Sequence, residues 1–309
     1  MTVRTTARSI SRSVREHLGQ KPPPALEVLA AFERACDLVG PGEQGRRAVV
    51  ALVTPEIGDG PLNIVLDGHC RDLTTIEPGT HARTDGERLR VGGLEIDLGQ
   101  AAVWEPRPDW AALRARRDAI AARLPALRAV GLERAPAGSF LALLDEGWRG
   151  NPPREAILAA AQPAVDALEA GWAGDAARLQ EGTAQLAGLG GGLTPGGDDF
   201  LCGAMLWARL AHPGPGSLCR AIVEIAAPRT ATLSAAFLQA AGQGECDAAW
   251  HSLLDALAHG DSVGIDRAAQ KVLARGATSG ADGLAGFLWA GTRCNAWLEA
   301  ATRAATAGQ

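Results

Sequence analysis

Two adjacent carboxylates follow a run of glycines in the segment GLGGGLTPGGDDFLCG, residues 188–203. Glycine lets the backbone adopt positive φ and approach a ligand closely. The apolar residues that follow predict a helix over 199–211, so the loop leads into a helix N-terminus. The free N–H groups and the positive dipole end found there bind phosphate or carboxylate groups. The segment therefore predicts a site for a small anion, with these candidate substrate-binding residues: Gly190, Gly191, Gly192, Thr194, Gly196 and Gly197.

The two aspartates admit more than one role. A helix start needs only one carboxylate as an N-cap, and we expect either Asp198 or Asp199 to fill that place. The other is free to bind Mg²⁺, to accept a hydrogen bond from a substrate amide, or to act as a base. Both are therefore candidate catalytic residues and candidate magnesium ligands. The sequence indicates no certain cofactor, and Mg²⁺ is the one candidate. No lysine follows the glycines, which excludes the P-loop pattern, and the spacing is not the dinucleotide fingerprint.

A second segment, GATSGADGLAGFL at residues 276–288, repeats this pattern. Gly, Thr, Gly and Asp recur at the same offsets 84 residues further along, and each segment precedes an apolar helix. Coincidence is the alternative in a chain with 38 glycines. If the repeat is genuine, two helix N-termini converge on one anionic ligand, which backbone groups of 190–197 and 276–281 would hold. The second segment adds four candidate substrate-binding residues: Thr278, Ser279, Gly280 and Asp282.

Two further polar residues are candidate substrate contacts. Asn63 follows a Gly-Pro turn in TPEIGDGPLNIVL, where its amide can recognise a ligand or can bond the backbone of the turn. Arg229 stands beside Thr230 at an expected helix start and can pair with a carboxylate or phosphate, although helix capping accounts for Thr230. The six histidines show no HxxxH or HExxH spacing, so a zinc site is not indicated.

The elements that must position these residues fall into two parts. Residues 46–104 contain short, partly alternating apolar runs, broken by turn residues about every ten positions, which is typical of an antiparallel sheet or small barrel. Asp85-Gly86 is a hairpin dipeptide. From Asp109, which we expect to be an N-cap, the apolar period becomes helical. The sequence therefore predicts an α+β protein.

The expected domains are a β-rich domain over 1–108 and an α-helical domain over 109–309 that carries the glycine and aspartate motifs. A helix is expected to lead the first domain, with Ile10, Val14 and Leu18 on one face.

The composition excludes several classes of protein. Hydrophobic residues make up 47% and charged residues 21%, which indicates a folded chain. The net charge of −5 gives no basic field, so we expect no nucleic-acid partner. No stretch reaches the ~20 apolar residues of a membrane span, so we expect no membrane partner. The six cysteines lie far apart without a CxxC pair, which favours reduced core residues and a cytoplasmic location.

The segment GLGGGLTPGGDDFLCG resembles the signature of the AllH-like family, which is related to a subunit of bacterial oxamate carbamoyltransferase. TPEIGDGPLNIVL and LEIDLGQAAVWEP are also similar to that family. The resemblance implies a subunit of a carbamoyltransferase-like enzyme in purine-nitrogen metabolism, with other subunits as partners and a small anionic amide as substrate. The family reaction, in the catabolic direction, cleaves oxalurate with phosphate to give oxamate and carbamoyl phosphate.

The residues leave two other functions open. Paired aspartates at helix starts can build the metal site of a Mg²⁺-dependent hydrolase. The chain can also be a non-catalytic subunit that binds a small molecule. Metal-dependent melting distinguishes the first alternative, and activity of the isolated chain excludes the second.

Overall fold

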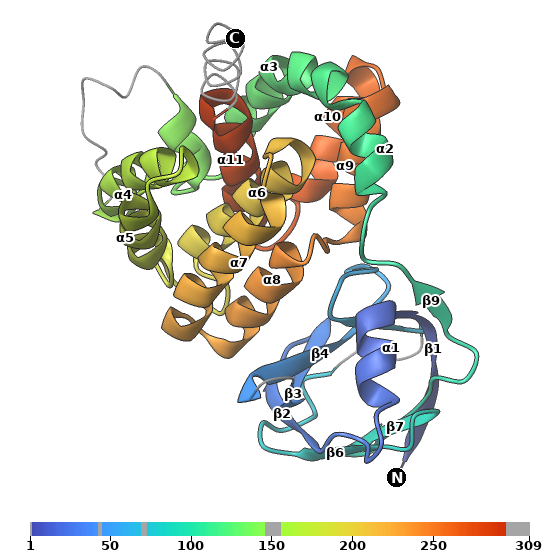
Figure 1. Ribbon diagram of the computed structural model, residues 1–309. Helices are drawn as coiled ribbons and strands as arrows, with labels where there is room; N and C mark the ends of the chain where they lie inside the picture. The colour runs from blue at the N-terminus through green and yellow to red at the C-terminus, as the bar shows by residue number, and fades with distance from the viewer. Residues whose placement is uncertain (1, 43–44, 69–72, 146–155, 295–309) are drawn as a thin grey trace, which may run out of the picture. The chain divides into compact units, whose positions relative to one another are not determined.

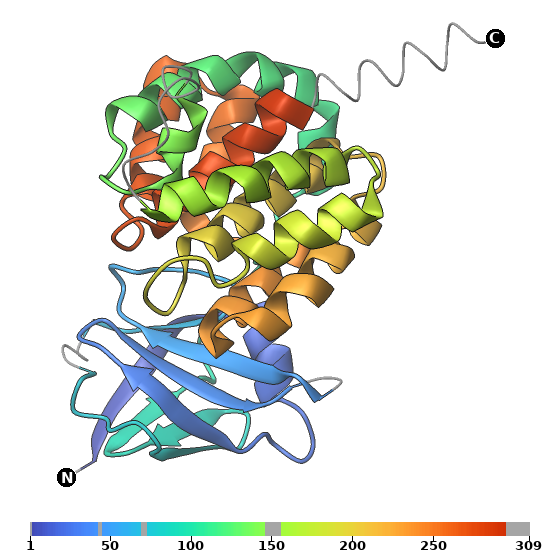
Figure 2. The same cartoon turned by 90° about the vertical axis from the view of Figure 1, so that its left-hand side faces the viewer.

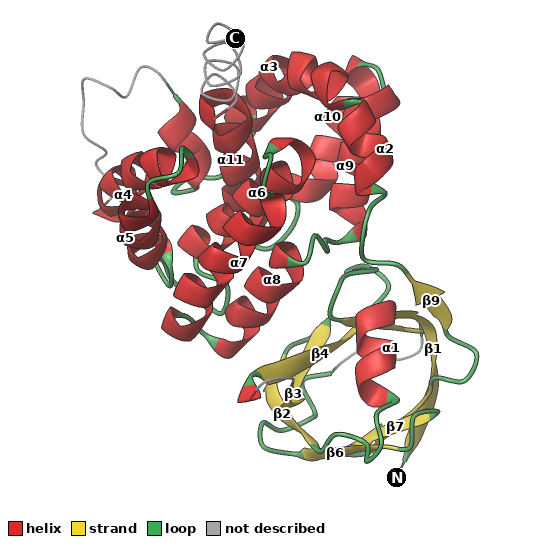
Figure 3. Cartoon of the chain, in the orientation of Figure 1, coloured by secondary structure: helices red, strands yellow, loops and turns green. Residues whose placement is uncertain are grey.

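The computed structural model describes residues 2–42, 45–68, 73–145 and 156–294 (Figure 1). The chain divides into two compact units, Met1–Pro108 with Glu245–Ala248, and Asp109–Gly244 with Ala249–Gln309. Strands build the first unit and helices build the second (Figure 3). The predicted α+β class is confirmed.

The first unit is a sheet that closes on itself into a small barrel. The described strands of the ring run in the order β5-β4-β3-β2-β6-β7-β8-β1, and β1 pairs with β5 to close it. A further strand, β9, extends the sheet beyond β1. The bounds are β1 Val3–Ser11, β2 Leu26–Ala31, β3 Ala35–Pro41, β4 Arg47–Val53, β5 Asn63–Leu66, β6 His81–Thr84, β7 Arg88–Val91, β8 Leu94–Asp97 and β9 Ala102–Trp104.

Strand β1 makes the closure possible because its pairing changes partway along. Residues 3–6 pair with β8, and the register with β5 shifts between Ala7 and Ser9. Such an irregularity bends a strand and increases its twist. The pairings of β1 with β8 and β9, and of β4 with β5, are parallel, and the other described pairings are antiparallel. Fully buried Ile10, Leu38 and Leu52 belong to the core.

The N-terminal segment differs from the sequence prediction. Ile10 lies in β1, whereas the helix α1 spans Arg12–Leu18 and buries only Val14 and Leu18 of the three expected residues. Thr and Ser at alternate positions of β1 hide its period of two from a hydrophobicity reading. The Asp85-Gly86 hairpin is confirmed, since it joins the antiparallel β6 and β7 with Gly86 at a φ of 92°.

The second unit is helical, and α4 and α5 form a hairpin of helices in it (Figure 2). Asp109 is the predicted N-cap, and its carboxylate accepts the N–H groups of Ala111 and Ala112 at 3.1 and 3.0 Å. The bounds are α2 Trp110–Ala115, α3 Arg117–Glu133, the 3₁₀ turn η2 Phe140–Leu144, α4 Ala156–Trp172, α5 Ala176–Leu186, α6 Gly196–Ala211, α7 Pro215–Ala226, the 3₁₀ turn η4 Ala227–Arg229, α8 Thr232–Gly242, α9 Ala248–His259, α10 Ser262–Leu273, α11 Ser279–Trp289 and the π-helical turn η5 Ala290–Cys294.

Helices α6 and α11 form the centre of this unit (Figure 1). Both are apolar on nearly all sides, as expected of helices surrounded by others. Their backbones touch, because a Cβ at Gly203 would overlap the carbonyl oxygen of Gly283, and one at Gly286 would overlap that of Phe200. Among the described helices, none has the length and apolar character needed to cross a membrane.

The helices expected over 139–148, 154–171 and 282–304 include residues that the structure does not describe, at 146–155 and 295–309. Cys70 also lies outside the described residues.

Candidate functional site

The two glycine-rich segments that share a sequence pattern meet in the helical unit. Thr194 Oγ1 lies 3.0 Å from Ser279 Oγ, although 85 positions separate them. A Cβ at Gly196 would lie 2.8 Å from Oδ2 of Asp282. We call residues 188–199 and 276–282 the paired helix starts. Because the first residues of α6 and α11 contact each other, the positive ends of both helix dipoles lie together.

Each helix start also packs closely on the helix before it through a glycine. A Cβ at Gly197 would overlap the carbonyl oxygen of Leu186, at the end of α5. A Cβ at Gly280 would overlap that of Val272, near the end of α10. Both segments of the sequence repeat thus belong to a helix-loop-helix unit, although the loop spans 187–195 before α6 and 274–278 before α11.

Neither aspartate is an N-cap, so that expectation was wrong. Pro195 occupies the N-cap position and α6 begins at Gly196, which places Asp198 and Asp199 inside the first turn. The sequence predicted a start three residues later because glycine pairs usually interrupt helices. Glycine is needed at both helical positions, because Asp282 and Leu186 leave no room for a side chain beside Gly196 and Gly197.

Asp198 is 1% exposed and is bound on both carboxylate oxygens. Oδ1 accepts the backbone N–H of Gly188 at 3.0 Å. Oδ2 accepts the hydroxyl of Ser234 at 2.7 Å and that of Thr230. Thr230 therefore does not cap α8, whose N-cap is Ala231. The Asp198 carboxylate fastens the glycine-rich loop to the start of α8, which is a positioning role.

Asp282, the counterpart of Asp198, does the same for another segment. It is 2% exposed, and its Oδ1 accepts the backbone N–H of Phe140 at 2.7 Å. The hydroxyl of Thr278 is a second hydrogen-bond partner. Burial raises the pKa of Asp282, and these two hydrogen bonds oppose the rise. The turn η2 is thereby held against the paired helix starts.

Asp199 is the carboxyl group that keeps bonding capacity. Its Oδ2 is buried and has no hydrogen-bond partner among the described residues. Burial raises the pKa of Asp199 well above its ordinary value, Asp282 and Asp198 add to the rise, and a hydrogen bond from Ser279 opposes it. The carboxyl group therefore retains its proton to higher pH than an ordinary aspartate. Glycine occupies the equivalent place in α11, Gly283, so only one half of the repeat carries this acid.

The loop before α6 combines exposed glycines with backbone groups that are already bound. Gly190 and Gly192 have φ values of 127° and 83°, which favour glycine. Gly191 and Gly192 have open space where a Cβ would be. The N–H of Gly197 donates to Leu189 and that of Gly280 to Arg275, at 2.9 and 3.0 Å. Two of the predicted anion-binding N–H groups therefore already donate to carbonyl oxygens. The hydroxyls of Thr194 and Ser279 bind each other.

Asn63 and Arg229 are used locally. Asn63 belongs to the barrel unit, and its side-chain amide donates to the carbonyl of Gly58 at 2.8 Å, which is the turn-stabilising alternative. The exposed guanidinium of Arg229 donates to the carbonyl of Ile225. The carbonyl of Arg229 lies against Gly188, so this residue contacts the glycine-rich loop through its backbone.

The donor set does not suit a metal ion. No group of three His, Cys, Asp or Glu side chains within the described ranges could hold one. Three donors already bind Asp198, one of the two predicted magnesium ligands. The geometry therefore gives no support to a Mg²⁺ site at Asp198 and Asp199.

Two polar groups of this site were not among the predicted contacts, although Ser234 lies in the same expected helix start as Arg229 and Thr230. Ser234 binds Asp198, and the spacing of Thr230 and Ser234, four residues apart, was a usable signal for two hydroxyls on one side of a chain segment. The N–H of Phe140 binds Asp282, and no side-chain pattern announces a backbone contact.

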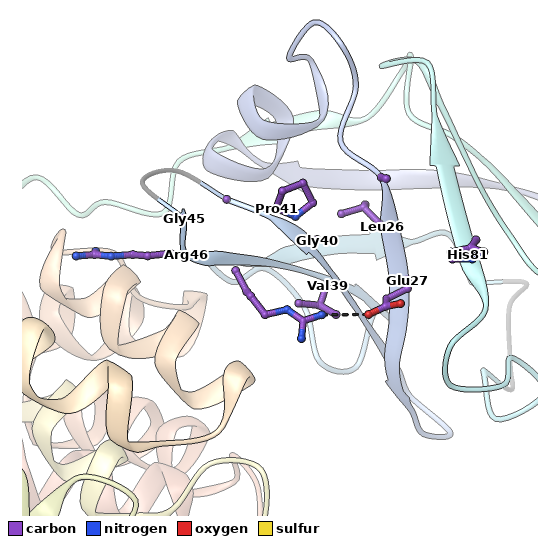
Figure 4. Close-up of a pocket in the computed structure, with 11 residues that line it drawn as sticks. Leu26, Glu27, Val39, Gly40, Pro41, Gly45, Arg46 and His81 are labelled. Atoms are coloured by element: carbon purple, nitrogen blue, oxygen red, sulfur yellow. Dashed lines mark hydrogen bonds and ion pairs between the residues drawn. The ribbon is translucent and has the colours of Figure 1, made fainter.

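A hollow lies on the barrel unit and contains none of the predicted residues. It measures about 390 Å³ and is lined by β2, β3 and the start of β4 (Figure 4). Its charged residues include Glu27 and Arg47, which form an ion pair at 3.1 Å. The hollow is open to solvent and has no concentration of catalytic groups, so the paired helix starts remain the candidate site.

Comparison with known proteins bears on the same residues. The family model described as oxamate carbamoyltransferase subunit AllH matches residues 186–291. This range begins at the last residue of α5 and ends just beyond α11, so it contains both paired helix starts. No curated protein and no solved structure matches the chain. The match, over the third of the chain that carries the candidate site, supports assignment of the protein to an AllH-like family.

Proposed function

We propose that the chain is a subunit of an oxamate carbamoyltransferase-like enzyme, and that the paired helix starts bind its small anionic amide substrate. One observation carries the proposal. Two segments with the same pattern, 84 residues apart and both inside the family match, are joined through Thr194 and Ser279. A role in purine-nitrogen metabolism and a cytoplasmic location are part of the same proposal, and they rest on the family resemblance and the cysteine pattern.

The electrostatics of the paired helix starts are compatible with an anion. Two helix N-termini that lie together attract negative charge. The nearby carboxyl groups oppose an anion where they are ionised, and burial raises the pKa of Asp199 and of Asp282, which favours their neutral forms. The hydroxyls of Thr194 and Ser279 bind each other in the free chain, and in this proposal the ligand takes the place of that hydrogen bond. In this proposal the exposed loop and these hydroxyls hold the phosphate or carboxylate group of the substrate.

The roles of the two aspartates separate in this proposal. Asp198 shapes the loop through its three internal hydrogen bonds. Asp199 acts on the substrate, because its Oδ2 has no partner within the described chain.

Isothermal titration of the purified chain with phosphate, oxalurate and carbamoyl phosphate tests the proposal. Replacing Ser279 by alanine should weaken binding about tenfold or more, because a hydrogen bond to a charged ligand contributes about 1.5–3 kcal/mol. Ser217→Ala is the matched control, since Ser217 is a hydroxyl in α7 bound only to the carbonyl of Gly214. Absence of binding by all three compounds, with and without the other enzyme subunits, would refute the substrate assignment.

The formation of carbamoyl phosphate from oxalurate and phosphate tests the enzymatic role. Activity of the chain with its partner subunits, lost in Asp199→Asn, is the expected result. Full activity of that variant would leave only a non-catalytic binding role. Activity or melting that depends on Mg²⁺ and loses this dependence in Asp198→Asn and Asp199→Asn would favour the hydrolase instead.

A further inference from the structure

Two buried polar atoms without hydrogen-bond partners belong to segments that meet at the paired helix starts. They are Oδ2 of Asp199 and Oγ of Ser139. Ser139 is completely buried, and it precedes η2 without capping it. Burying a polar group without a partner is costly, and folded proteins rarely leave one without a ligand or an ordered water. The two atoms are therefore available to a bound group.

The contacts of neighbouring residues show that the two segments adjoin. Ser139 is followed by Phe140, whose N–H donates to Asp282 and whose ring lies 3.4 Å from a Cβ built at Gly196. The other carboxylate oxygen of Asp282, Oδ2, lies 2.8 Å from the same Cβ built at Gly196. The backbone carbonyl oxygen of Asp199 lies 3.6 Å from a Cβ built at Gly283, the residue after Asp282. Ser139 and Asp199 are thus both neighbours of the contact between Gly196 and Asp282.

A carboxyl oxygen and a hydroxyl together complement a primary amide. The amide offers a carbonyl acceptor and an N–H donor on the same planar group. A protonated Asp199 donates to the carbonyl while the Ser139 hydroxyl accepts the N–H, and an ionised Asp199 reverses these roles. Ser279 already supplies one hydrogen bond to Asp199, which leaves Oδ2 for the ligand.

We propose that Asp199 and Ser139 bind the carbamoyl group of the substrate and are the residues that select an amide over a group of the same shape. The inference rests on the proposed function, in which the anionic end of the same substrate lies at the paired helix starts. It adds Ser139 to the site. Of the two partnerless atoms, one binds the carbonyl oxygen of the amide and the other binds its N–H group.

Two pairs of compounds test this selection by titration of the full chain. Carbamoyl phosphate and acetyl phosphate differ only by an amine in place of a methyl group, and oxamate and pyruvate differ in the same way. The chain should prefer the amide of each pair by about tenfold or more, because the methyl analogue leaves buried polar groups unpaired. In Asp199→Leu and Ser139→Ala the preference should fall severalfold, with little change in the affinity for inorganic phosphate.

Thr183→Val is the matched control. Thr183 is also completely buried with a partnerless hydroxyl, but it lies in α5 outside the paired helix starts. The valine variant should keep the full preference for the amide. An equal loss in Thr183→Val and Ser139→Ala would overturn the assignment of Ser139.

The outcomes separate the two proposals. Binding of phosphate with no preference for carbamoyl phosphate over acetyl phosphate overturns the amide assignment and leaves the anion site intact. Absence of binding by phosphate and both phosphorylated compounds overturns the proposed anion site itself. The unmodified chain decides between these results, so the test does not depend on the folding of either variant.

Discussion

Replacement of Asp198 by alanine tests whether a buried carboxylate holds the glycine-rich loop in place. The side chain accepts hydrogen bonds from the backbone of Gly188 and from the hydroxyls of Thr230 and Ser234. The alanine variant removes all three and leaves the buried hydroxyl of Ser234 without its acceptor. The loop should then separate from the start of α8.

The expected cost follows from these contacts. A hydrogen bond to a charged group contributes about 1.5–3 kcal/mol, but the three donors are not additive, because each regains some bonding to water once the loop opens. We expect Asp198→Ala to lower the free energy of unfolding of the helical unit by about 3–5 kcal/mol, which is at the upper end for a single substitution.

Asp175→Ala is the matched control for this measurement. Asp175 is an N-cap that accepts the N–H groups of Ala177 and Arg178, both at 3.0 Å, but its carboxylate is exposed. Loss of such a cap costs about 1 kcal/mol. Urea unfolding followed by tryptophan fluorescence reports on the helical unit, because Trp172, Trp207 and Trp289 lie in it.

A cost for Asp198→Ala no larger than that for Asp175→Ala would refute the reasoning. It would mean that the loop holds its conformation without the carboxylate, and that Asp198 is available for a ligand. A double-mutant cycle with Ser234→Ala sharpens the result, since a direct hydrogen bond predicts a coupling of about 1 kcal/mol or more.

Four further substitutions have expected outcomes. Gly203→Ala should cost about 3 kcal/mol or more, because its Cβ would overlap the backbone of α11, whereas Gly216→Ala in α7 meets open space and should stabilise by about 0.4–1 kcal/mol in the same unfolding assay. Burial raises the pKa of Asp37 to about 6 from 3.8, so folding loses stability as the pH rises through this interval. The free energy of unfolding of Asp37→Asn should rise relative to that of the wild type between pH 4 and 6, by about 3 kcal/mol at most. Above pH 6 the difference between the two should stay constant. Unfolding measured across pH 4–8 that shows a constant difference would contradict this account. Ser139→Ala should leave the free energy of unfolding unchanged or raise it by about 1 kcal/mol, because the lost hydroxyl has no partner, and a loss above 2 kcal/mol would indicate a structural hydrogen bond.

Local sequence signals were sufficient for much of the fold. The turn at Asp85-Gly86 and the N-cap at Asp109 depend on contacts within a few residues, and both were predicted. Strand β1 was missed because long-range pairing with β5 and β8 holds it in the fold. Its polar residues at alternate positions do not reveal this pairing. Hydrophobic periodicity shows only that one face of an element is buried. It does not show that β1 closes the ring of strands.

The sequence by itself also determined where the candidate site is, because glycine, threonine and aspartate recur at equal offsets in two segments. Only the tertiary structure decided what each acid does. Asp198 and Asp199 are neighbours in the chain, yet helical geometry turns their side chains about 100° apart, so one meets α8 and the other meets Ser279. The same packing of α6 on α11 brings Thr194 to Ser279, and no local rule encodes a contact across 85 residues.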